Sequence, residues 1–114
     1  MEILLDTSLI LSAVRNKIDI FEELLEHKVI IPKQVLVELE GLSKNKDEAK
    51  LALKILELNK FKKIDLKTKN TDKGIINYSR QNPKIIIATL DKEIKNSIKN
   101  KKMIIRQKKK LEII

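Results

Sequence analysis

The chain has 114 residues, the length of one domain, and we expect residues 1–114 to form a single folded unit. A hydrophobic fraction of 42% supports a packed core, and a charged fraction of 36% with mixed sign argues against disorder. The lack of cysteine excludes disulfides and thiolate metal sites, and the single histidine excludes a multi-histidine metal site. No apolar run reaches the ~18 residues of a membrane span, and the start MEILLD is acidic where a signal peptide is basic. We therefore expect a cytoplasmic protein that does not bind membranes.

The net charge of +9 is spread unevenly. Residues 1–40 carry four Lys or Arg and eight Asp or Glu, whereas residues 84–114 carry ten and three. This distribution suits an enzyme that holds cations with carboxylates and neutralises the phosphates of a polyanion with lysines. The same lysine-rich composition is also typical of thermophilic and AT-biased proteomes, so charge alone leaves nucleic-acid binding open.

Short apolar runs and apolar residues at helical spacing alternate along the chain. In the first half they predict a strand over 3–5, a helix that follows the capping residues 6–8, a helical segment over 18–26, a strand over 29–31, and helices over 32–42 and 47–58. In the second half they predict a weak edge strand over 61–66, a helix from Thr71 or Asp72 to Arg80, a strand over 84–88, a helix from Asp91, and strands over 102–105 and 111–114. This alternation predicts a mainly parallel sheet with helices on both faces, which is a three-layer α/β/α fold.

Acidic residues follow three predicted strands at the edge where parallel sheets bind ligands. Asp6 comes directly after the first strand, Asp72 opens the helix after the third, and Asp91 follows the fourth by three residues. Each aspartate alone is also explained as a helix N-cap. Together, the three would repel one another unless a divalent cation neutralised them, and carboxylate ligands select Mg²⁺ or Mn²⁺. The pattern therefore predicts an oxygen-ligated metal site at this edge.

The helix after the second strand offers a further acid, either Glu38 or Glu40. Both glutamates lie near a border of the apolar stripe of that helix. Helix phase therefore does not choose between them.

Four segments resemble, in order and spacing, the four acidic motifs of the PIN-domain nucleases. They are ILLDTSLIL at 3–11, IPKQVLVELEGL at 31–42, TDKGIINYS at 71–79 and IIIATLDKEIKNSI at 85–98. The family pattern fits Glu38 better than Glu40. Lys73-Gly74 departs from it, because many members carry a further acid and an alanine at these positions. Within the family, the chain is similar to small archaeal stand-alone proteins near the ribosomal-RNA-processing endonuclease branch, with VapC-type toxins as the other nearby group.

The resemblance implies a PIN-like α/β/α fold and metal-dependent hydrolysis of RNA to products with 5′-phosphate and 3′-hydroxyl ends. Asp6, Glu38, Asp72 and Asp91 would be the catalytic residues and would hold Mg²⁺ or Mn²⁺. Ser8 and Thr89 are placed to orient a carboxylate or a water, with simple capping as the alternative. RNA is the implied substrate, and the candidate protein partners are a second copy of the chain, an antitoxin and a ribosomal assembly protein.

Outside these motifs, Arg106, Lys108, Lys109 and Lys110 form a candidate patch for the RNA backbone, with a solvated turn as the alternative. His27 is interpreted as a helix-end base. Only three residues are aromatic, so we expect contacts mainly to phosphate.

Two other functions stay open. The chain could be a catalytically silent PIN-like domain that binds RNA or a ribosome-assembly partner. A receiver-type phosphoacceptor domain would need an acid pair where this chain has Asp6-Thr7. With only two glycines, Gly41 and Gly74, the chain has no P-loop or dinucleotide motif.

Overall fold

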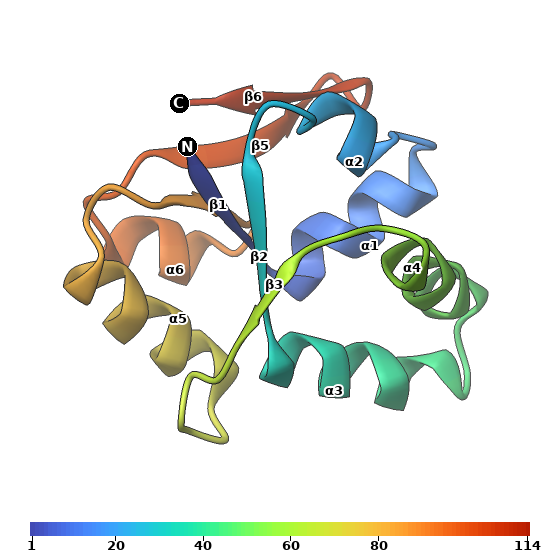
Figure 1. Cartoon of the computed structure of the whole chain (residues 1–114), viewed down its shortest axis with the longest axis horizontal. Coiled ribbons are helices and arrows are strands. Elements are labelled where there is room, and N and C mark those ends of the chain that lie inside the picture. The colour runs from blue at the N-terminus through green and yellow to red at the C-terminus, as the bar shows by residue number, and fades with distance from the viewer.

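The computed structural model describes residues 1–114, which form a six-stranded sheet in the order β3-β2-β1-β4-β5-β6 (Figure 1). The strands are β1 (Glu2–Leu5), β2 (Lys28–Pro32), β3 (Lys62–Ile64), β4 (Ile86–Ala88), β5 (Lys102–Arg106) and β6 (Lys110–Ile113). The helices are α1 (Thr7–Arg15), α2 (Ile20–Glu23), α3 (Lys33–Ser43), α4 (Asp47–Glu57), α5 (Thr71–Gln81) and α6 (Lys92–Ser97). Only β6 runs antiparallel to its neighbour, so the prediction of a mainly parallel sheet is confirmed.

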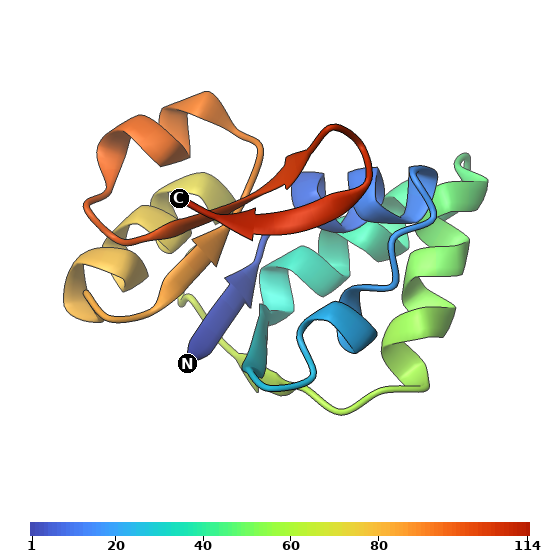
Figure 2. The ribbon, with the colours of Figure 1, turned by 90° about the horizontal axis from the view of Figure 1, so that it is seen from above.

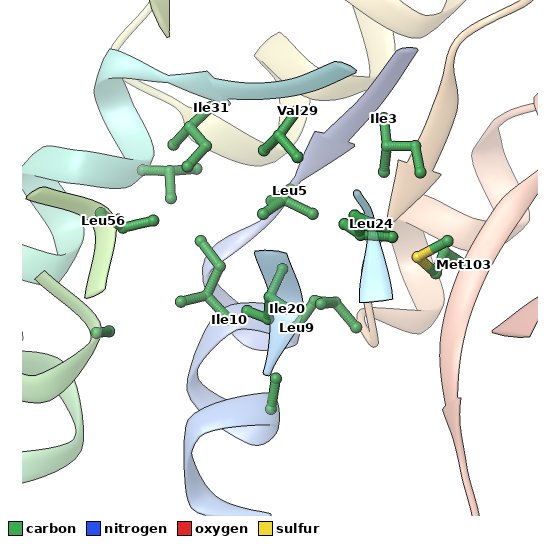
Figure 3. Packing of buried hydrophobic residues seen from close by; sticks show 14 of the residues in the cluster. Ile3, Leu5, Leu9, Ile10, Ile20, Leu24, Val29, Ile31, Leu56 and Met103 are labelled. Carbon is green, nitrogen blue, oxygen red and sulfur yellow. The ribbon is translucent and has the colours of Figure 1, made fainter. Parts of the chain in front are cut away.

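Helices cover both faces of the sheet, as Figure 2 shows, with α1, α3 and α4 on one side and α5 and α6 on the other. Strand residues alternate between the two faces. Ile3 and Leu5 pack into the larger core with α1 and α4 (Figure 3), whereas Leu4 packs into a second core with Ile75 of α5 and Ile94 of α6. The predicted α/β/α fold is therefore confirmed.

Strand order reverses beside β1. The chain proceeds outward from β1 to β2 and β3, and then returns to the other side of β1 with β4. Open α/β sheets bind ligands at such a reversal, outside the carboxyl ends of the strands, because the connecting helices leave in opposite directions. We call the edge at the carboxyl ends of β1 and β4 the crevice. The β1–β4 register pairs Leu5 with Ala88, so the residues that follow both strands meet at one level.

The strands β3 and β4 are shorter than predicted, and two helical segments also differ from the predictions. The N-cap of α5 is Asn70, whose side chain accepts a hydrogen bond from Lys73 N at 3.0 Å, and not Thr71 or Asp72. Helix α2 has only four residues, and His27 lies in the turn after it, with its backbone N–H bonded to Leu24 O. His27 is therefore not a helix-end base. None of the helices is long and apolar enough to cross a membrane.

Candidate active site

Asp6 is the most buried acid of the crevice, with 5% of its surface exposed. It is the N-cap of α1, and its Oδ1 accepts a hydrogen bond of 2.8 Å from Thr7 N. Burial raises the pKa of Asp6, because the charged form loses its hydration, and the charge of Asp91 raises it further. The ionised form of Asp6 therefore lowers the stability of the fold unless a cation lies close to the carboxylate.

Two hydroxyl groups hold the second oxygen of Asp6. Thr89 Oγ1 donates a hydrogen bond of 2.7 Å to Asp6 Oδ2, and Ser8 Oγ donates one of 3.2 Å to the same oxygen. These hydroxyls also accept backbone N–H groups of the β4–α6 turn: Leu90 N bonds to Ser8 Oγ, and Asp91 N bonds to Thr89 Oγ1. Ser8 and Thr89 therefore touch Asp6 and also order the segment that carries Asp91.

Asp91 is the N-cap of α6, and its Oδ1 accepts a hydrogen bond of 3.0 Å from Ile94 N. Its backbone follows β4 next to Asp6 in the crevice, as the strand register requires. The capping bond occupies one carboxylate oxygen. Capping and ligand binding are thus compatible for Asp91, because a carboxylate has lone pairs on both oxygens.

Glu38 reaches the crevice and Glu40 does not. Thr7 Oγ1 donates a hydrogen bond of 3.3 Å to Glu38 Oε1 across the start of α1. Glu40 instead lines a hollow of about 280 Å³ between α3 and α4, together with Leu53 and Phe61. Thr7 was not among the predicted site residues, although its place beside Asp6 in the sequence is a signal for it.

Asp72 stands in the first turn of α5, and capping does not explain its position because Asn70 is the cap. Partial burial raises its pKa, and the charges of Asp91, Asp6, Glu38 and Glu93 raise it further. These acids therefore act on one another across the crevice. We call Asp6, Glu38, Asp72 and Asp91 the acidic rim. Glu93, two residues after Asp91, is a neighbouring acid that the sequence interpretation missed.

The acidic rim offers only oxygen donors. No group of three or more acidic or histidine side chains is close enough together to hold a metal ion by itself. Mg²⁺ needs no such cage, because it keeps several waters and is usually bound through one or two carboxylates and the phosphates of its substrate. The buried carboxylate of Asp6, with its raised pKa, fits such an ion.

Close packing explains the glycine of the third motif, whereas nothing in the structure explains Lys73. A Cβ atom at this position would lie 2.7 Å from Thr68 Cγ2 and 2.9 Å from Leu66 Cβ. Real Cβ atoms do not approach other carbons this closely. Glycine at 74 therefore lets the loop before α5 pack directly on the helix that carries Asp72.

The predicted basic patch is a hairpin turn between β5 and β6. Arg106 Nε is bonded to Glu112 Oε2 at 2.6 Å across the hairpin, whereas Lys108, Lys109 and Lys110 are exposed and form no salt bridge. The hairpin packs on α2, where Leu111 N donates to Glu23 Oε1. Exposure of the three lysines is compatible with both alternatives, a patch for the RNA backbone and a solvated turn.

Two surface hollows lie away from the acidic rim. His27 lines one of them with Lys28, Lys60 and Lys62, beside the starts of β2 and β3 and therefore opposite the acids. The other, of about 670 Å³, lies between α1, α2 and α4 and is mainly apolar. Neither hollow contains a residue of the acidic rim.

Comparison with known proteins agrees with this geometry. Residues 3–110 match the family described as PIN like domain. The chain is 31% identical over 121 residues to Ribonuclease VapC4 of Methanocaldococcus jannaschii, covering 95% of this chain and 92% of the relative. The structure resembles that of the PIN domain endonuclease Utp24, with a TM-score of 0.83, 25% identity, and coverage of 98% of this chain and 90% of the other. It also shares its fold with VapBC2 from Rickettsia felis, solved with a promoter DNA fragment, with a TM-score of 0.56, 19% identity, and coverage of 90% and 98%.

Proposed function

The chain belongs to the PIN-domain nuclease family, and from this premise we propose that it is an endoribonuclease that hydrolyses RNA phosphodiester bonds at the acidic rim with the help of Mg²⁺ or Mn²⁺. The observation that carries the proposal is the electrostatics of the rim. Partial burial raises the pKa of Asp72, and the charges of the three other rim acids, which come from distant parts of the sequence, raise it further. Repulsion between like charges destabilises the folded protein, and a bound divalent cation relieves it.

In this proposal Asp6 and Asp91 hold the ion, and Glu38 and Asp72 complete the site directly or through waters. A bound Mg²⁺ or Mn²⁺ would lower the pKa of a water and stabilise charge on the attacking and leaving oxygens. Thr89 and Ser8 fix the orientation of the Asp6 carboxylate by donating to its Oδ2, and would so prepare it to hold the ion. Thr7 holds Glu38 at the rim in the same way.

RNA is the proposed substrate because the relative of 31% identity is a ribonuclease. We propose that Lys108, Lys109, Lys110 and, after release from Glu112, Arg106 contact its phosphates. Two cellular roles fit such an enzyme: ribosomal RNA processing, or toxin activity controlled by an antitoxin. Induced expression separates them, because a toxin arrests growth unless a partner gene is co-expressed and a processing enzyme does not.

Incubation of the full chain with structured RNA tests the activity. We expect cleavage in Mn²⁺ or Mg²⁺ and none in EDTA, with 5′-phosphate and 3′-hydroxyl ends on the products. Products with 2′,3′-cyclic phosphate ends, or equal cleavage in EDTA, would contradict the metal-dependent mechanism.

A second function remains a candidate because no three acids stand together as a ready metal cage. In that case the chain is a catalytically silent PIN-like domain that binds RNA or a ribosome-assembly partner. It would bind RNA with the same affinity in EDTA and in Mn²⁺ and would cleave it in neither.

A further inference from the structure

The loop over residues 65–70, between β3 and α5, ends two residues before Asp72. Figure 1 shows it beside the starts of α3 and α5. It carries Lys67 and Lys69, which are both exposed and form no salt bridge. Two positive charges therefore lie on the loop that leads into the helix of Asp72.

This loop is held by side chains rather than left free. Gln34, in the first turn of α3, donates from Nε2 to Asp65 Oδ1 at 2.8 Å and accepts from Leu66 N at 3.1 Å. Asp65 Oδ1 also accepts from Lys67 N at 2.8 Å, and Asp65 Oδ2 lies 3.6 Å from Lys33 Nζ. One glutamine and one aspartate thus tie the loop to α3.

The other end of the loop is fixed to α5. Thr68 Oγ1 accepts from Asn70 N at 3.2 Å, and the side chains of Thr68 and Leu66 occupy the space that Gly74 leaves open. Leu66 also packs against the core under α5. A loop held in this way loses little backbone freedom when a ligand binds, so its charges are preorganised.

Lys67 lies at a φ of 57°, in the left-handed region where glycine or asparagine is more stable than lysine. Strain alone does not indicate a function, because Lys17 and Lys108 have the same backbone conformation at φ values of 58° and 57°. What distinguishes Lys67 is its place on a clamped loop that leads into α5, the helix that carries Asp72. The acids of the rim repel the phosphates on either side of a scissile bond, and nearby cations offset this repulsion.

From this arrangement we propose that residues 65–70 form a rigid lip whose Lys67 and Lys69 hold the RNA strand by its phosphates beside the acidic rim. The inference rests on the proposed function, because it takes RNA to be the substrate. The lip contains no aromatic residue for base stacking. We therefore expect the lip to bind RNA independently of base sequence.

The substitution K67N tests the lip, and K17N is its matched control. Asparagine tolerates a positive φ, so both variants keep the backbone and lose one positive charge. Lys17 follows the far end of α1 from Asp6, so its loss should change nothing. Affinity for an unstructured RNA should be measured in EDTA, where binding is separated from cleavage, over a range of salt concentrations.

We expect K67N to make the slope of log affinity against log salt shallower by roughly 0.7. If K67N and the wild type bind equally at ~1 M salt, K67N then binds about fivefold more weakly than the wild type at ~0.1 M salt. K17N should match the wild type. If K67N and K17N behave alike while the wild type binds RNA, the lip proposal is wrong. If the wild type binds no RNA, the proposed substrate is itself wrong. K108N, at the third lysine with this backbone conformation, tests the hairpin patch separately.

A second variant tests rigidity without changing charge. Q34A removes the clamp on Asp65 and Leu66, so we expect trypsin to cut after Lys67 and Lys69 faster than in the wild type, and RNA affinity to fall. Faster proteolysis together with weaker RNA binding in Q34A would support the proposal that the clamp preorganises the lip. Equal proteolysis rates with unchanged RNA affinity in Q34A would overturn it.

Discussion

Thr89 Oγ1 donates a hydrogen bond of 2.7 Å to Asp6 Oδ2, although 83 positions separate the two residues in the sequence. This bond lowers the pKa of Asp6 and so opposes the effect of burial. The same hydroxyl accepts Asp91 N at 3.1 Å. One threonine therefore joins two acids of the rim that come from different strands.

Replacement of Thr89 by valine should weaken the proposed metal site. We expect T89V to lose about 1.5–3 kcal/mol of stability, because a buried charged acceptor loses its donor. Divalent-ion affinity should fall about 10–100-fold, because Asp6 is no longer oriented. Titration calorimetry with Mn²⁺ measures the affinity, and T89S, which keeps the hydroxyl, should restore most of it. Equal affinities in T89V and T89S would show that the hydroxyl does not orient Asp6.

The two glutamates of α3 give a paired prediction. Glu38 accepts a hydrogen bond from Thr7 at the rim, whereas Glu40 lies on the α4 side of the helix. We expect E38Q to lower kcat for RNA cleavage at least about tenfold, since it removes a carboxylate from the metal site. E40Q should cleave at the wild-type rate. Equal losses in the two variants would contradict the assignment of Glu38.

The two glycines give a prediction about stability. A methyl group added at Gly74 would meet Thr68 and Leu66, whereas one added at Gly41 would find no atom within 4 Å. We expect G74A to lower the free energy of unfolding by about 1 kcal/mol, because overpacking outweighs the gain in helix propensity. G41A should raise it by up to about 1 kcal/mol. Urea unfolding measures both, and a stabilised G74A would mean that the loop moves aside freely.

The raised pKa of Asp6 predicts a pH dependence in metal-free buffer. Burial raises this pKa above the ordinary value of 3.8, so the folded chain binds the proton more tightly than the unfolded chain. At neutral pH the charged carboxylate therefore lowers stability, and this cost is relieved as the pH falls through the raised pKa toward 3.8.

Denaturant unfolding in EDTA between about pH 4 and 7 measures this contribution. The free energy of unfolding of the wild type, taken relative to D6N, should increase as the pH falls. A difference that does not change with pH would mean that Asp6 titrates alike in the folded and unfolded chain.

Much of the fold followed from apolar patterns in the sequence. Ile85-Ile86-Ile87 indicated a central strand, and β4 indeed lies between β1 and β5. The weak, lysine-rich segment near Ile64 was predicted at an edge, where β3 lies. These predictions succeeded because each depends on local periodicity and burial.

Other features depend on contacts between distant residues. Helix phase left Glu38 and Glu40 equivalent, because the packing of α3 on α4 decides which of them faces the rim. Likewise, Gln34 and Asp65 lie 31 positions apart, and no local signal predicts that they clamp one loop. Asn70 was missed as a cap because Thr71 and Asp72 are equally good capping residues, and only the bond to Lys73 N distinguishes it.

The most direct test of the central claim is the rate of RNA cleavage by D6N in Mn²⁺, compared with the wild type. Asparagine keeps a capping oxygen for α1 but removes the charge that would hold the ion. We predict that D6N stays folded by circular dichroism, binds RNA in EDTA at least as tightly as the wild type, and cleaves it at least about 1,000-fold more slowly. Cleavage by D6N at the wild-type rate would contradict the account, because the acidic rim would then not be the site of the chemistry.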